Sequence, residues 1–260
     1  MNSAEFKHLY ALREEISGWR FLHLDPYSLR SPGERFGAEQ LESSGANIAR
    51  VLHRIQMETA TVERPEGSLA DISADLNALI KGVRRVSVIE NDQTKKWEVL
   101  VHSKNGGVHS ASVASDGTMR ILALLAALYD PKYRGLICFE EPENGVHPLR
   151  LRQLVRFMRG LVCQPGATED LMEVGLSQMV VNSHSPVVLA AMDAHQAVLL
   201  DSISRKEEGS GGQWTQSTVS RVRLVQQEGN VPLPGAAGDI YANRSEVDHY
   251  RAAALLEDLE

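Results

Sequence analysis

An apolar stretch that runs directly into two carboxylates is the part of this sequence with the clearest chemical use. Residues 136–139 (Leu-Ile-Cys-Phe) precede Glu140 and Glu141, and we expect a buried strand that ends at these acids. Open parallel sheets bind ligands at the carboxyl ends of their strands. Burying two adjacent acids costs free energy unless a cation neutralises their charge or one of them holds a proton for a functional purpose. The pattern predicts a cation site, and a solvated turn after a core strand is the alternative.

A second segment has the residue types of a phosphate cradle. The run from Ser115 to Arg120 leads into an apolar stretch that we expect to be a helix. Gly117 would let the backbone approach an anion, and the hydroxyls of Ser115 and Thr118 would add donors at the positive end of the helix dipole. An ordinary helix N-cap and turn is the alternative interpretation.

A histidine follows the next apolar strand. Residues 178–182 predict this strand, and Ser185 and Pro186 are typical of a helix N-cap and first helical position. His184 is therefore expected at the same sheet edge as Glu140 and Glu141. A structural role for a lone histidine is the alternative.

Together and in this order, these segments resemble the ABC-type P-loop ATPases, in particular the SMC/RecF-like AAA ATPases of DNA repair and bacterial anti-phage systems. The resemblance extends weakly over residues 19–30. One departure is Glu140, which stands where Walker B usually has an aspartate. The matching segments are Ser115–Arg120 for the signature motif, Ile137–Glu141 for Walker B, Glu143–Pro148 for the D-loop region and Asn182–Pro186 for the switch-histidine loop.

The resemblance implies ATP and Mg²⁺ as cofactors, with ATP sandwiched between two protomers. It implies that Glu140 holds Mg²⁺ through water, that Glu141 is the general base, and that His184 senses the γ-phosphate. The signature segment would reach the ATP of the opposite protomer. The implied residues are Glu141 and His184 for catalysis, Ser115, Asp116, Gly117, Thr118 and Asn144 for nucleotide binding, and Glu140 for the metal.

The segment Gly-x-x-x-x-Gly-Lys-Ser/Thr, which holds the β- and γ-phosphates in such enzymes, is not found at any of the 20 glycines. Three explanations stay open: a truncated gene, a P-loop on a separate polypeptide, or a relic that no longer depends on nucleotide. We therefore expect a homodimer or a P-loop-bearing partner subunit. We also expect the chain alone to turn over ATP negligibly.

The elements that must position these residues follow from hydrophobic periodicity. Alternating helices and apolar strands after residue 114 predict an α/β fold with a parallel sheet. The resemblance implies that this fold is like an ABC-ATPase head whose N-terminal P-loop strand is absent. Residues 83–113 predict a small antiparallel meander. The expected organisation is one partial ATPase domain over 1–260, with a helical and loop region (1–82), the meander (83–113), a motif-bearing core (114–205) and a C-terminal hairpin and tail (206–260).

Further elements are expected along the chain. Periodic apolar residues predict helices over about 46–58, 69–80 and 151–162, and residues 197–200 predict a short strand. The glycine-rich segment 206–212 is expected to be a hairpin tip or a short linker, and the charged tail from Asp239 is expected to be a terminal helix.

Composition narrows the class of protein. A formal net charge of −7 over 260 residues excludes a generally basic nucleic-acid coat. DNA stays a possible partner by resemblance, and a local patch of arginines at positions 150, 152, 156 and 159 is either a phosphate contact or a solvated helix face. The longest strictly apolar run, 121–129, is too short for a membrane span. With two cysteines and no secretory signal, we expect a cytoplasmic protein and no membrane partner.

Overall fold

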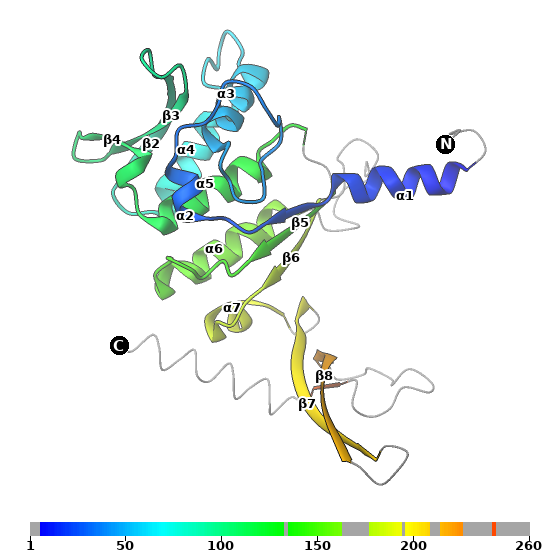
Figure 1. Cartoon of the computed structure of the whole chain (residues 1–260). Coiled ribbons are helices and arrows are strands. Elements are labelled where there is room, and N and C mark those ends of the chain that lie inside the picture. The colour runs from blue at the N-terminus through cyan, green and yellow to red at the C-terminus, as the bar shows by residue number, and fades with distance from the viewer. Residues whose placement is uncertain are drawn as a thin grey trace. The chain divides into compact units, whose positions relative to one another are not determined.

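A computed structural model describes residues 6–132, 135–162, 177–193, 196–208, 214–225 and 241–242. The chain divides into two compact units, residues 1–183 and residues 184–260, and each is described by itself (Figure 1). No helix among these residues is long and apolar enough to cross a bilayer.

A three-stranded parallel sheet carries the residues of interest in the first unit. Its strands are β1 (Arg20–Leu22), β5 (Gly135–Glu140) and β6 (Ser177–Asn182), in the order β1-β5-β6. The register aligns Leu22 with Phe139 and Glu140 with Asn182. The predicted α/β fold with a parallel sheet is confirmed.

Among the described residues, one face of this sheet is buried and the other is largely exposed. Ile137 and Phe139 are buried, whereas Phe21 and Val180, which flank Cys138 on the other face, are more than half exposed. The prediction that all of residues 136–139 are buried is therefore wrong, as is that of a buried strand over 178–182. Successive side chains of a strand point to opposite faces, and the helices cover one face.

The long helix α5 (Asp116–Leu128) forms the centre of the first unit. Ser115 caps it by accepting a hydrogen bond from the amide of Thr118 at 3.2 Å. Every residue from Gly117 to Ala127 is buried, so α5 is enclosed on all sides. Arg120 lies over the ring of Phe139, 5.8 Å from its centroid, and this contact places α5 on the buried face of the sheet.

The remaining helices and an antiparallel sheet surround α5. In Figure 1, helices α3 and α4 separate α5 from the meander β2-β3-β4. This meander is the predicted one, although residues 111–113 form a 3₁₀ turn in place of strand. Cys138 is half-buried, which raises the pKa of its thiol, and Cys163 lies outside the described residues. The other elements of this unit are α1 (Lys7–Gly18), α2 (Pro26–Arg30), α3 (Ile48–Thr59), α4 (Ser68–Leu79), β2 (Val83–Glu90), β3 (Trp97–Ser103), β4 (Val108–Ser110) and α6 (Pro148–Leu161).

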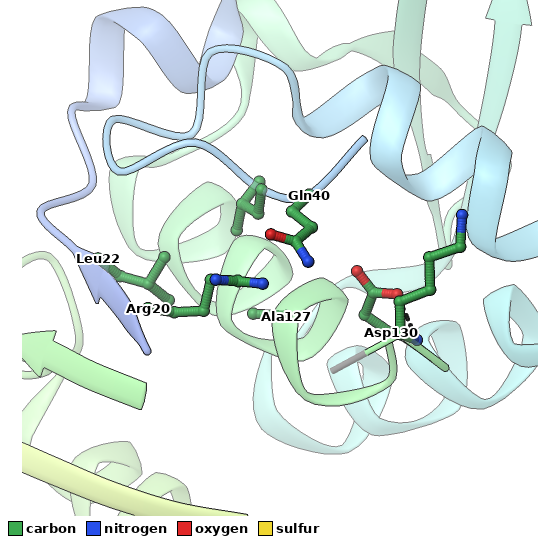
Figure 2. A pocket seen from close by; sticks show the side chains of 7 residues that line it. Arg20, Leu22, Gln40, Ala127 and Asp130 are labelled. Carbon is green, nitrogen blue, oxygen red and sulfur yellow. Dashed lines mark hydrogen bonds between the residues drawn. The ribbon is translucent and has the colours of Figure 1, made fainter. Parts of the chain in front are cut away.

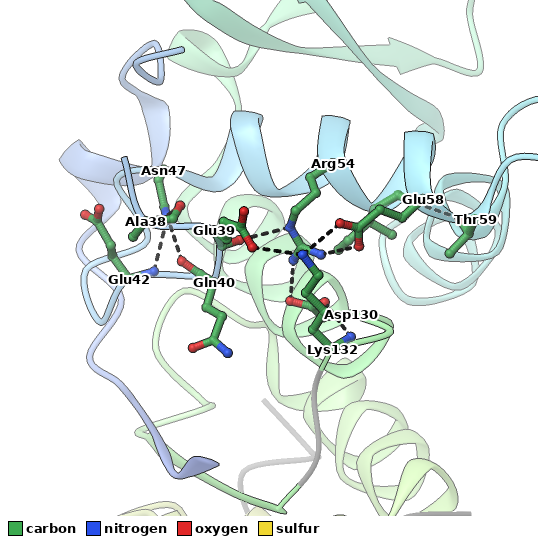
Figure 3. Close-up of polar contacts among 11 residues, drawn as sticks. Ala38, Glu39, Gln40, Glu42, Asn47, Arg54, Glu58, Thr59, Asp130 and Lys132 are labelled. Atoms are coloured by element: carbon green, nitrogen blue, oxygen red, sulfur yellow. Dashed lines mark hydrogen bonds and ion pairs between the residues drawn. The ribbon is translucent and has the colours of Figure 1, made fainter. Parts of the chain in front are cut away.

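An ion network closes the far end of α5 (Figure 3). The Arg54 guanidinium donates to Glu58 at 2.7 Å and to Asp130 at 2.5 Å, and Lys132 pairs with both Glu58 and Glu39. Because Arg54 and Asp130 are largely buried, these contacts join α3, the end of α5 and the loop that holds Glu39.

The described residues of the second unit form one helix and a small sheet. Helix α7 (Pro186–Ala191) begins as predicted, with Ser185 accepting a hydrogen bond from the amide of Val187. Strand β7 (Val198–Glu208) is much longer than predicted, and it pairs antiparallel with β8 (Trp214–Val225). The predicted terminal helix from Asp239 is wrong at β9 (Tyr241–Ala242), which pairs with β8. The rest of that tail lies outside the described residues, as do residues 209–212 of the predicted glycine-rich segment 206–212, whose first three residues belong to β7.

Candidate functional site

The two acids of interest stand at the carboxyl end of β5. Glu140 is the last residue of the strand, and its side chain is 51 % exposed and contacts Nδ1 of His23. Glu141 follows in the loop and is half-buried. Neither carboxylate is fully buried, so the expectation of two adjacent buried acids is wrong. Burial alone therefore does not require a cation at this position. Both acids nevertheless lie at the carboxyl end of a strand in a parallel sheet, the edge where such sheets bind ligands, and this position supports a binding site.

The backbone at Glu141 adopts an unusual conformation. Its φ angle is 47°, a left-handed conformation that costs a non-glycine residue of the order of 1 kcal/mol. The Glu141 amide donates to both the backbone and side-chain oxygens of Asn182, at 3.1 and 3.0 Å. The side-chain amide of Asn144 donates to the Glu141 carboxylate at 2.6 Å. These bonds fix both the backbone and the carboxylate of Glu141.

The start of α5 is held by an arginine of α2. The Arg30 guanidinium donates to the carbonyl oxygen of Ala114 at 3.0 and 2.7 Å, and it also pairs with the Asp116 carboxylate. The Ser115 hydroxyl lies 2.8 Å from that of Thr118. The Ser115 hydroxyl thus caps the helix, which is the role that the alternative interpretation of this segment gives it, and the carboxylate of Asp116 is directed at an arginine.

The loop after the acids packs on the start of α5. A Cβ atom on Gly117 would lie 2.0 Å from the carbonyl oxygen of Gly145. Only glycine, which has no Cβ, allows the two backbones to approach so closely at position 117. Tight backbone packing is thus one reason for glycine in the predicted phosphate cradle, and it brings that segment beside the loop of Asn144.

Two further residues of this site, His23 and Arg120, were not assigned from the sequence. Arg120 donates to the carbonyl oxygens of Leu24, Glu140 and Glu141. A histidine directly after the extended stretch 19–22 and an arginine inside the Ser115–Arg120 segment were the available signals. Neither signal identifies the partner, because the bonded residues are far apart in the chain.

His184 is the first residue of the second unit, whereas Glu140 and Glu141 belong to the first. It lies in the loop between β6 and α7, as predicted, and is exposed. Its neighbour Ser183, the last residue of the first unit, donates to the Glu143 carboxylate at 2.8 Å. That bond ties the end of β6 to the loop after the acids.

A small pocket of the first unit lies away from these residues (Figure 2). It is bordered by β1, the loop before α3 and the end of α5, whereas the predicted residues surround the start of α5. We therefore do not assign it to the site. Its lining residues are Arg20, Leu22, Gln40, Leu41, Ala127, Asp130 and Lys132.

Several solved structures are similar to this chain. An Smc head domain with a coiled coil and joint from Pyrococcus yayanosii has 13% sequence identity and a TM-score of 0.37, covering 61% of this chain and 26% of that one. An Smc head bound to the C-winged helix domain of ScpA has 14% identity and a TM-score of 0.42, covering 78% and 55%. A third, from work on ATP-driven dimerisation and DNA-stimulated activation of SMC ATPases, has 16% identity and a TM-score of 0.36, covering 67% and 87%.

The chain thus spans about a quarter of the first of these structures. No curated protein matches the sequence. Residues 5–190 match the family described as "AAA domain, putative AbiEii toxin, Type IV TA system". This match covers well over half of the chain and includes every residue of the candidate site. The protein therefore belongs to this family of AAA domains.

Proposed function

We propose that this chain is a portion of the ATP-binding and ATP-hydrolysing engine of a DNA repair or anti-phage defence ATPase, acting by ATP-sandwich dimerisation. The observation that carries the proposal is the junction of two segments. The loop that follows Glu140 and Glu141 at the end of β5 packs on the start of α5 through the contact between Gly117 and Gly145. Membership in an AAA family supports it.

The residues fit a hydrated magnesium ion that arrives with a nucleotide. Among the described residues, no three His, Cys, Asp or Glu side chains are grouped so as to hold a metal. Mg²⁺ usually keeps several waters and binds one or two carboxylates together with substrate phosphates. Glu140 would hold this ion through water, and the ion would neutralise charge on the phosphates.

The neighbouring residues would then perform the remaining steps. Glu141 would polarise the attacking water as general base, with its carboxylate oriented by Asn144. His184 would contact the γ-phosphate. Residues 115–118 of one protomer, Asp116 among them, would bind the ATP held by the opposite protomer.

Turnover and binding of ATP by the purified chain test this proposal. We expect weak Mg²⁺-dependent binding and negligible hydrolysis, because positioning supplies most of phosphoryl-transfer catalysis and the sequence has no Gly-x-x-x-x-Gly-Lys-Ser/Thr segment. Addition of a P-loop-bearing partner should produce turnover that Glu141→Gln abolishes. Robust turnover by the chain alone that Glu141→Gln abolishes would contradict the expectation of an inactive chain, and absence of any ATP binding would contradict the function.

The same missing segment favours a second candidate function, a non-hydrolysing partner that donates residues 115–118 in trans to an intact ATPase. The mixing experiment separates the two. A donor would stimulate its partner even with Glu141→Gln, but would lose this effect with Ser115→Ala.

A further inference from the structure

One buried arginine joins the two halves of the proposed site. Arg120 lies in the first turns of α5 and is 8 % exposed. Its Nη1 donates to the carbonyl oxygen of Leu24 at 2.8 Å, and its Nη2 donates to those of Glu140 at 2.9 Å and Glu141 at 3.1 Å. A side chain of the signature-like helix thus holds the ends of β1 and β5 together.

The bonding pattern of Arg120 is specific to a guanidinium. All three acceptors are backbone carbonyl oxygens, reached by a planar fork with fixed donor directions. A lysine ammonium is a single point charge and lacks this fork. Among the described residues, Nε of Arg120 has no hydrogen-bond partner, and an unpaired buried donor is unfavourable for stability. The arrangement is therefore better explained by the geometry that it imposes than by its contribution to stability.

That geometry concerns Glu141 above all. Its carbonyl oxygen accepts from Arg120, while its amide donates to Asn182. A left-handed conformation at a non-glycine residue persists only where the surroundings over-determine it, and these two bonds do so. Since the backbone conformation sets the direction of the side chain, Arg120 helps to aim the Glu141 carboxylate.

We propose that Arg120 is a positioning residue, which fixes Glu140 and Glu141 relative to the start of α5 so that a ligand at residues 115–118 is sensed by the two acids. This inference rests on the proposed ATPase function for its purpose, although its geometry can be tested without nucleotide. Burial is the main influence on the pKa of the Arg120 guanidinium and lowers it. The negative charges of Glu141 and Asp116 act in the opposite direction, from a longer distance.

Arg120→Lys tests this role, with Arg54→Lys as the matched control. Arg54 is also a largely buried arginine, but it pairs with Asp130 beyond the opposite end of α5. Two quantities would be measured in the full chain: hydrogen exchange of the Glu141 amide by NMR, and the ratio of ATP affinities with and without Mg²⁺. A purely structural role would weaken both affinities alike and leave their ratio unchanged.

We expect Arg120→Lys to speed exchange at Glu141 at least tenfold and to reduce the Mg²⁺-dependent gain in affinity, and Arg54→Lys to do neither. Unchanged exchange at Glu141, or equal acceleration in both variants, would overturn the positioning role. Faster exchange in Arg120→Lys alone, with no ATP binding by the wild-type chain, would support the positioning of Glu141 and contradict the ATPase function.

The wild-type chain provides a test if Arg120→Lys does not fold. A guanidinium held by three carbonyls should rotate slowly about its Nε–Cζ bond and give separate NMR signals for Nη1 and Nη2. A single averaged signal for Arg120 would overturn the proposal.

Discussion

Gly117 at the start of α5 and Gly145 in the loop after the acids are packed backbone against backbone. A Cβ on Gly117 would meet the Gly145 carbonyl oxygen at 2.0 Å, and a Cβ on Gly145 would lie 2.9 Å from the Gly117 nitrogen. Gly145 also has a φ angle of +75°, which favours glycine. The contact makes the predicted nucleotide-binding segment and the loop of Asn144 one packed structure.

Gly117→Ala should therefore lower the free energy of unfolding by about 2 kcal/mol through overpacking, and displace the loop of Asn144. Gly160→Ala is the matched control, because a Cβ there has no neighbour within 4 Å and alanine is the better helix former. Urea unfolding of both variants measures the difference. Equal free energies of unfolding would contradict this prediction, because the loop of Asn144 would then move aside without loss of stability.

Arg30→Ala should destabilise the chain by about 1–3 kcal/mol, because it leaves the Ala114 carbonyl and the Asp116 carboxylate without their donor. Arg64→Ala removes an exposed pair with Asp71 and should cost at most about 1 kcal/mol. Chemical denaturation of the two variants tests the contrast. A smaller effect for Arg30→Ala than for Arg64→Ala would refute the clamp at the start of α5.

His53 should make stability depend on pH. Partial burial lowers the pKa of its imidazole below the ordinary value of 6.5, so the unfolded chain takes up the proton first as pH falls. The stabilisation is complete above pH 6.5 and is lost as pH falls through the lower pKa of the folded chain. His53 stacks on Trp97 with ring centroids 3.8 Å apart. Melting curves between pH 7.5 and 5.5 should show a smaller pH effect in His53→Gln. The pKa of His102 is also lowered mainly by burial, so this residue should contribute to the dependence that is left in the variant.

Glu140→Gln should remove the effect of Mg²⁺ on ATP binding. We expect Mg²⁺ to tighten binding to the wild-type chain about tenfold, equal to ~1.4 kcal/mol, and to have no effect on the variant. Glu34→Gln is the control, since Glu34 is an exposed carboxylate paired with Lys96. Isothermal titration with and without Mg²⁺ measures both. Retention of the effect in Glu140→Gln would exclude Glu140 as the metal residue.

The sequence by itself determined the type of several elements and their order along the chain. Periodic apolar residues predicted α3, α4 and α6, a β-rich texture with turn residues predicted the meander, and Ser-Pro at 185–186 predicted the start of α7. These are local signals, which depend on hydrophobic spacing, capping and turn chemistry within a few residues. The position of Glu140 at the carboxyl end of a strand followed from the same signals.

Tertiary structure alone decided how the site is held together. The contacts of Arg120 with Leu24 and Glu140, of Arg30 with Asp116 and of Gly117 with Gly145 join segments far apart in the chain. No local pattern specifies such partners, because they depend on how the elements pack. Packing also left one face of the parallel sheet exposed and both acids accessible, since side-chain periodicity indicates which residues share a face but not whether another layer covers it.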